Sequence, residues 1–211
     1  VLWKWDSTIK NYVDADGLIE PWRAYWVQTD APRTLVLEAK PEFPKDQKPR
    51  TKVLKAHFAS KTNWKLRLAA ASQASSDPEN YFGVHPLAKD GYDKMDYGEP
   101  PLIGDMLSVF FVHERGNGAA VRYSSDMRSG VFSTNEWKFG VSRPIDSPGP
   151  VTIEISDISL LPNNLYVYLC DKGKYIDMRA TGAYACSSSL SQTYYTVVVT
   201  DCLLYTSPSP R

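Results

Sequence analysis

Short segments in which apolar and polar side chains alternate constrain the fold of this chain most. Val151, Ile153 and Ile155 are separated by Thr152 and Glu154, and the segment 136–142 repeats the pattern with aromatic residues. A period of two places successive side chains on opposite faces of an extended strand. One face is then buried and the other faces water, as in an antiparallel sheet packed on one side. These segments therefore predict half-buried β-strands.

Ten segments of this kind follow one another at short intervals. They are Val53–Phe58, Trp64–Ala71, Leu107–His113, Ala119–Ser124, Glu136–Ser142, Val151–Ser156, Leu165–Cys170, Lys174–Arg179, Ala183–Ser187 and Tyr194–Thr200. Clusters of Gly, Pro, Asn and Asp separate many of them, as expected for tight turns. No stretch shows a convincing helical period. The sequence predicts an all-β protein whose main part is an antiparallel β-sandwich of jelly-roll or immunoglobulin-like type.

Changes in composition divide the chain into four parts. Residues 1–39 are rich in aromatic residues, and Trp22–Thr29 and Thr34–Ala39 predict a hairpin that ends a preceding β-domain. Residues 40–52 contain three prolines and many charges, which is typical of a linker. The predicted sandwich spans 53–201. Because the chain begins inside the aromatic stretch, we expect it to be a piece of a longer protein.

The fourth part is the tail, 202–211, with the sequence CLLYTSPSPR. This string resembles the in-frame translation of a transposase-type sequencing adapter. The resemblance implies that the tail is not native, and such segments are set aside before the fold is considered. A natural Ser/Pro-rich linker is the alternative interpretation.

Charge and cysteine content narrow the possible classes of function. The formal net charge is zero with acidic and basic residues mixed throughout, which argues against a nucleic-acid partner. No apolar run approaches the length of about 18 residues that a membrane helix needs. Outside the tail, the cysteines are Cys170 and Cys186. A meander would hold them two strands, or about 9–10 Å, apart, which exceeds the span of about 7 Å for a disulfide, so we expect free, buried thiols.

The stretch between Ser72 and Gly104 is the longest segment without a clear period, and we expect an irregular loop there. Its acidic residues Asp90, Asp93, Asp96 and Glu99 are candidate Ca²⁺ ligands, since Ca²⁺ prefers oxygen donors. Their spacing differs from that of known calcium loops. The alternative is a turn-rich loop in which these side chains bond neighbouring backbone.

Motifs of catalysis are missing from the sequence. The histidines are scattered without metal-ligand spacing, and neither a nucleophile elbow nor a phosphate-binding glycine loop is present. We therefore expect no catalytic residues and no cofactor other than the candidate calcium. The tryptophans offer a different possibility, because flat rings stack on sugars. Exposed, coplanar rings among Trp3, Trp22, Trp26, Trp64 and Trp137 would indicate a glycan-binding surface, whereas core packing is the alternative.

Several short motifs in a fixed order carry a resemblance to a known module. They are WKLRLAA (64–70), DPENYFGV (77–84), DGYD (90–93), EPP (99–101), a V-x-F-F strand near Val109 and IDMR (176–179), with IEPWRAYWV (19–27) before them. In this order they resemble a C-terminal module of large extracellular proteins of Bacteroidetes-like bacteria. Such proteins resemble cargo of the type IX (Por) secretion system. The resemblance implies an extracellular or cell-surface location and supplies no catalytic residues.

Together these observations predict a non-catalytic structural or spacer module of a secreted or cell-surface multidomain bacterial protein. Its partners would be neighbouring domains of the same chain or a cell-surface glycan. A glycan-binding module and an accessory domain of a secreted hydrolase are the alternatives.

Overall fold

The computed structural model describes residues 1–17, 19–20, 23–34, 63–101, 106–114, 120–130, 133–144, 149–187 and 190–204. Nearly all regular structure in these ranges is β, arranged in three sheets. The strands are β1 (Leu2–Asp6), β2 (Asn11–Asp14), β3 (Tyr25–Val27), β4 (Trp64–Ala71), β5 (Ser76–Val84), β6 (Ser108–Glu114), β7 (Ala120–Tyr123), β8 (Ser125–Arg128), β9 (Thr134–Ser142), β10 (Val151–Ser156), β11 (Tyr166–Asp171), β12 (Lys174–Asp177), β13 (Ala183–Cys186) and β14 (Gln192–Thr200). A 3₁₀ turn, η1 (Ile158–Leu160), and a short helix, α1 (Met178–Thr181), complete the described elements.

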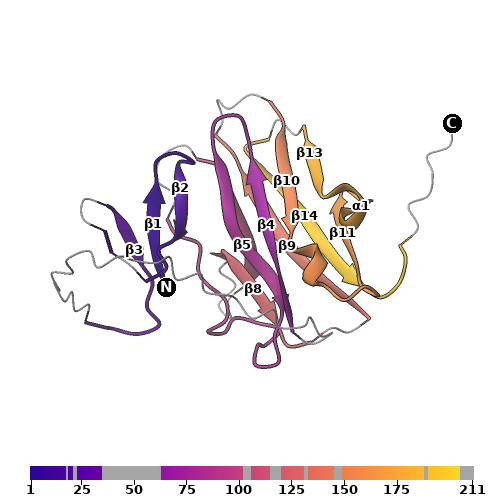
Figure 1. The fold of residues 1–211 in the computed structure, drawn as a ribbon, viewed down its shortest axis with the longest axis horizontal. Coiled ribbons are helices and arrows are strands. Elements are labelled where there is room, and N and C mark those ends of the chain that lie inside the picture. The colour runs from indigo at the N-terminus through magenta and orange to yellow at the C-terminus, as the bar shows by residue number, and fades with distance from the viewer. Residues whose placement is uncertain are drawn as a thin grey trace, which may run out of the picture.

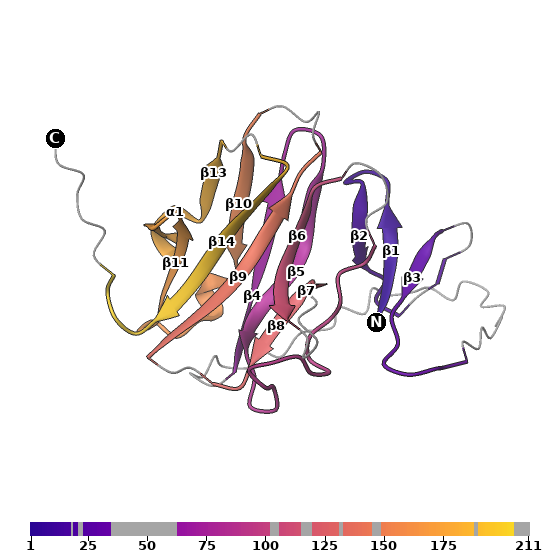
Figure 2. The ribbon, with the colours of Figure 1, turned by 180° about the vertical axis from the view of Figure 1, so that it is seen from behind.

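Two packed sheets form the predicted β-sandwich, which confirms the all-β fold class. The five-stranded sheet has the order β13-β10-β4-β5-β8 and the six-stranded sheet has the order β12-β11-β14-β9-β6-β7. Figure 1 shows the outer face of the five-stranded sheet, and Figure 2, which views the molecule from behind, shows the outer face of the six-stranded sheet. All strand pairs are antiparallel except β5 and β8, which run parallel. The last strand, β14, lies in the middle of its sheet between β11 and β9.

The core lies between the two sheets and follows the alternation in the sequence. Val151, Ile153 and Ile155 are each at most 4% exposed, as predicted. Across the interface, the rings of Trp64 and Trp137 meet edge to face with centroids 5.6 Å apart. Burial of aromatic side chains contributes most of the apolar area in such a core. The sandwich is therefore held together mainly by apolar packing between its layers.

A third, three-stranded sheet is formed by the N-terminal residues in the order β2-β1-β3. It lies beside the β5 side of the sandwich (Figure 1) and contacts β5 through β2. β3, which lies within the expected strand Trp22–Thr29, pairs with β1. The hairpin of Trp22–Thr29 with Thr34–Ala39 stays a prediction. Residues 35–39, the linker 40–52 and the expected strand Val53–Phe58 lie outside the described residues.

The expected loop between Ser72 and Gly104 is wrong in its first part. Residues 76–84 form β5, the partner of β4 within the five-stranded sheet. Asp77 and Asn80 are buried on this strand and break the apolar alternation that would have revealed it. The ladder with β4 also shifts register between Leu68 and Ala70, where two steps along β4 face the three steps from Asn80 to Asp77. The extra residue lies on β5, so the period of two is interrupted on β5 and kept on β4. Within the sandwich, the other strand that is not predicted is β8, whose four residues are too few to show a period. In the N-terminal sheet, β1 and β2 are not predicted as individual strands either.

The expected strand Lys174–Arg179 ends early, at Asp177. The Asp177 carboxylate accepts hydrogen bonds from the backbone N–H groups of Arg179, at 2.9 Å, and Ala180, at 3.3 Å, and so caps α1. The chain then crosses to the other sheet, where β13 pairs with β10. Cys170 and Cys186 therefore belong to different sheets rather than to one meander. Neither cysteine forms a disulfide, as predicted, although only Cys186 is buried.

Candidate functional site

Buried polar side chains gather where the N-terminal sheet meets the sandwich. Along residues 107–110, β6 pairs with β9 on one side, while its ladder with β7 begins only at Phe111. The other edge of β6 is therefore without a neighbouring strand at this point. A buried backbone group without a partner is costly, so side chains must take the place of that strand.

Three side chains complete this edge of β6. The N–H of Leu107 donates to Ser75 Oγ at 3.1 Å, and the N–H of Val109 donates to Asp77 Oδ2 at 2.6 Å. The Asn11 side-chain amide, on β2, donates to the carbonyl of Leu107 at 3.2 Å. Polar side chains thus connect the N-terminal sheet and β5 to the six-stranded sheet.

The carboxyl groups of Asp77 and Glu99 are the charged members of this cluster. Burial raises the pKa of Asp77 to about 6, against the opposing hydrogen bonds from Val109 and Asn80. Burial, followed by the nearby Asp77 charge, raises the pKa of Glu99 well above its usual value. The backbone and stem of Glu99 are partly exposed, but its carboxyl is enclosed and Oε1 accepts from Ser108 Oγ at 3.1 Å. Two carboxyls with perturbed pKa values in one place mark a candidate functional site.

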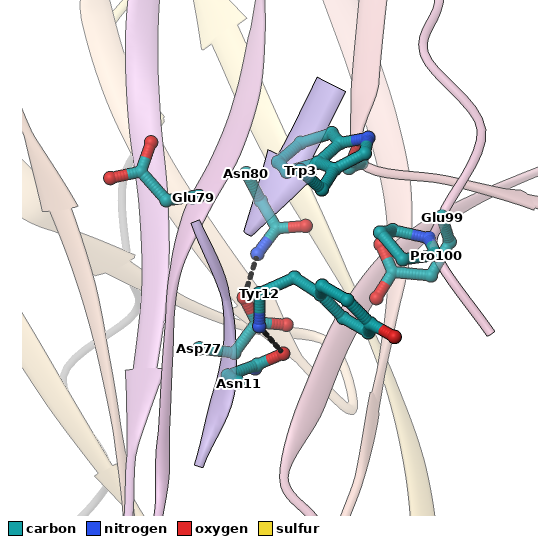
Figure 3. A pocket seen from close by; sticks show the side chains of 9 residues that line it. Trp3, Asn11, Tyr12, Asp77, Glu79, Asn80, Glu99 and Pro100 are labelled. Carbon is teal, nitrogen blue, oxygen red and sulfur yellow. Dashed lines mark hydrogen bonds between the residues drawn. The ribbon is translucent and has the colours of Figure 1, made fainter. Parts of the chain in front are cut away.

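A small cavity of about 10 Å³ separates these groups. Figure 3 shows Asp77 and Asn80 on one side of it and Glu99 on the other, with Trp3 and Tyr12 closing it. The Asn80 side chain donates to Asp77 Oδ1 at 2.8 Å, whereas its own oxygen has no hydrogen-bond partner. The volume suits a single small occupant.

A wider cleft of about 350 Å³ adjoins the cavity, with which it shares Trp3, Glu79 and Ser124. The remaining lining comes from the N-terminal sheet and its following turn and from the sandwich: Val1, Val13, Asp14, Asp16, Lys65, Tyr81 and Tyr97. The Tyr81 hydroxyl donates to Glu79 Oε2 at 2.6 Å, and Lys65 Nζ lies 4.2 Å from the centre of the Tyr81 ring. A cleft of this size with aromatic rings and a few polar groups is large enough for a small ligand.

A second charged cluster lies under the 85–97 segment. Arg128 donates twice to the Asp126 carboxylate, at 3.1 and 3.3 Å, and His113 Nε2 lies 3.0 Å from Asp126 Oδ2. Interaction with Asp126 raises the pKa of His113. Although burial opposes it, contact with His113 and Arg128 leaves the pKa of Asp126 below its usual value. Because each charge has a partner, the arrangement is that of a buried ion-pair network.

Each of the four residues predicted to bind calcium accepts hydrogen bonds from other groups of the protein. Asp90 Oδ1 accepts from the N–H and hydroxyl of Ser129, and Asp93 accepts from backbone N–H groups of Lys89 and Met95. Asp96 accepts from the N–H groups of Asp93 and Met127, whereas Glu99 turns inward toward Asp77. Within the described ranges, no three His, Cys, Asp or Glu side chains form a group suited to a metal. A calcium site made of these four residues stays a prediction.

The inner site escaped the sequence analysis because Asp77 and Asn80 were assigned to a loop. Their only signal is the DPEN string, whose Asp, Pro, Glu and Asn are typical of a turn rather than of a strand. Partners such as Asn11, distant in sequence, carry no recognisable pattern.

The tryptophans do not form one flat surface in the described part of the chain. Trp3, Trp64 and Trp137 are buried, and Trp26 is 39% exposed on β3. Trp22 lies outside the described residues. Core packing is therefore the role of the three buried rings.

Comparisons with protein-family models, with curated proteins and with solved structures give no match. The resemblance to the extracellular bacterial module stays a prediction. None of the described helices has the length and apolar character required to cross a membrane.

Proposed function

We propose that this chain is a non-catalytic structural module that holds neighbouring parts of a secreted or cell-surface bacterial protein in a fixed arrangement. The observation that supports this is the junction between the N-terminal sheet and the sandwich. Besides the Asn11 contact with Leu107, the Asn11 side chain donates to the carbonyl of Ser76 at 3.2 Å, and the N–H of Ser76 donates to the carbonyl of Ile9 at 3.3 Å.

The same junction is fixed at its other end. The N–H of Gly98 donates to Gln28 Oε1 at 3.0 Å, which ties the segment after β3 to the segment before β6. The hydrogen bond from Asn11 to Leu107 is buried and that from Gly98 to Gln28 is partly buried. Together they resist a hinge motion, because opening would leave these polar groups without their partners. A module of this kind transmits orientation from one neighbour to the next.

Backbone ¹⁵N relaxation tests the rigid junction. Amides of β1–β3 and of the sandwich should report a single rotational correlation time. In Asn11→Ala the N-terminal sheet should gain motion, whereas Lys10→Ala, an exposed change one residue away, should not. Separate correlation times in the unaltered chain would contradict the proposal. Turnover of glycoside, ester or peptide substrates by the purified chain would contradict its non-catalytic part.

The extracellular location and the type IX route rest on the motif resemblance. The coding sequence that follows residue 201 in the source genome provides the test. An immunoglobulin-like sorting domain encoded there would support export by this route. A domain typical of cytoplasmic proteins encoded there would refute it.

The wide cleft favours a second candidate function, namely glycan binding. Its carboxylates and Lys65 offer acceptors and a donor for sugar hydroxyls, while Tyr97, 42% exposed, offers a ring. A glycan array followed by titration should show binding that is lost in Tyr97→Ala and Lys65→Ala and kept in Tyr194→Ala, which changes an exposed ring on the other sheet. Glycan binding that is unchanged in Tyr97→Ala and Lys65→Ala would argue against the cleft as the binding site.

A further inference from the structure

Several of the residues that line the inner cavity offer oxygen acceptors beside the rings of Trp3 and Tyr12. Asp77 and Glu99 supply two carboxyls, and the Asn80 side-chain oxygen, on a residue only 1% exposed, has no partner (Figure 3). No lysine, arginine or histidine is among the lining residues. Arg122, the cation that acts on the Glu99 charge, places its guanidinium 4.0 Å from the centre of the Phe110 ring instead. The lining itself therefore supplies no positive charge to the two carboxyls.

We propose that this cavity is a Ca²⁺ site in which Asp77, Glu99 and the Asn80 side-chain oxygen are the protein ligands. Two carboxylates would neutralise the divalent charge, and the amide oxygen would gain the partner it lacks. Each carboxylate oxygen has two lone pairs, so the bonds from Val109 and Ser108 leave capacity for a metal. This inference does not depend on the proposed structural role.

The ligand chemistry and the space select calcium among common metals. All three ligands are hard oxygen donors, and soft or imidazole ligands that favour zinc or copper are absent from the lining. Magnesium usually keeps several waters in its coordination shell. Ca²⁺ takes six to eight oxygens in an irregular shell, and two bidentate carboxylates with the amide oxygen would supply five of them. Ser124, which also lines the cavity, would offer a sixth oxygen, whereas a space of about 10 Å³ cannot hold the several waters of a magnesium shell.

An ion would reach the cavity from the wider cleft. The two spaces share Trp3, Glu79 and Ser124, so these residues form the boundary that an ion would have to pass. Ca²⁺ would then join β5 to the 97–101 segment under the N-terminal sheet. Of the four residues that the sequence suggested as calcium ligands, only Glu99 takes part.

Thermal unfolding of the full chain at pH 7.5 tests the site. An ion bound at 100 times its Kd should raise Tm by about 5–10 °C relative to the chain in EDTA. Asp77→Asn and Glu99→Gln should each remove the shift. Asp16→Asn, an exposed acid at the outer cleft, should keep it. The same concentration of Mg²⁺ should give a much smaller shift.

Terbium luminescence gives an independent readout that does not depend on stability. Tb³⁺ in the cavity would be excited through Trp3, which lines it, and excess Ca²⁺ should quench the signal. The proposal would be overturned if Ca²⁺ left the Tm unchanged or if Mg²⁺ raised it equally. It would also be overturned if the shift in Tm were retained in Asp77→Asn and Glu99→Gln, or lost in Asp16→Asn.

Discussion

Replacement of Asp77 by asparagine is expected to stabilise the metal-free protein at neutral and alkaline pH. The carboxyl is buried, and its pKa rises from 3.8 in the unfolded chain to about 6 in the fold. The folded state then binds more protons than the unfolded state between these values. This contribution to stability is complete below pH 3.8 and is lost as the pH rises through about 6.

The size of the effect follows from that shift. A change of about two pKa units corresponds to about 3 kcal/mol, which is the cost of the ionised carboxylate at pH 8. At pH 4.5 the same linkage gives a cost of about 1 kcal/mol. Asparagine does not ionise, so the free energy of unfolding of Asp77→Asn should exceed that of the wild type by these amounts. The advantage should grow with pH.

Asparagine can also replace the hydrogen bonds of Asp77. Its oxygen can accept from the N–H of Val109, and its amide can donate to Asn80 if the Asn80 amide turns over, since the Asn80 oxygen is without a partner. The substitution therefore tests the charge rather than the contacts.

Urea unfolding in EDTA at pH 4.5, 6 and 8 measures the effect, with Asp16→Asn as the exposed control. An Asp77→Asn variant that is less stable than the wild type at pH 8, with an unchanged m value, would refute the reasoning. The fold would then require the ionised carboxylate.

Three further predictions concern other parts of the sandwich. Gly83→Ala should lower the free energy of unfolding in urea by about 1–3 kcal/mol, because an added Cβ would lie 2.2 Å from the carbonyl oxygen of Trp64. An unchanged free energy of unfolding would contradict this close approach. Arg179→Lys should lower the free energy of unfolding by about 1.5–3 kcal/mol, because the guanidinium donates to the carbonyls of residues 161, 162 and 165. An equal loss of stability in the exposed control Lys172→Ala would contradict this. By NMR, the pKa of His113 should lie above 6.5 in the wild type and return toward 6.5 in Asp126→Asn. The contribution of protonated His113 to stability is then lost as the pH rises through the folded pKa. A wild-type pKa at or below 6.5 would contradict the contact with Asp126.

The sequence predicts those elements whose stability comes from apolar burial. β4 and β10 begin and end where the alternation places them, because each lies inside a sheet with one face in the core. The sequence does not predict elements that depend on polar contacts with distant segments. β5 carries Asp77 and Asn80 on its buried face, and only the edge of β6 explains them.

The calcium prediction shows the same division at the level of single residues. Sequence spacing places Asp90, Asp93, Asp96 and Glu99 in one stretch, but each carboxylate is directed by the donor closest to it. Asp93 and Asp96 satisfy nearby backbone N–H groups, which local turn chemistry explains. Glu99 lies across the cavity from Asp77, and no local rule predicts an electrostatic interaction between carboxyls 22 positions apart.

The central position of β14 bears on how the protein is made. A ribosome delivers the chain from its N-terminus, yet the strand that joins β9 to β11 ends at Thr200. Until these residues emerge, the nascent six-stranded sheet has an open slot flanked by unpaired edges. Folding must therefore wait for translation to reach this strand, and the incomplete chain is the form most exposed to aggregation or to capture by chaperones.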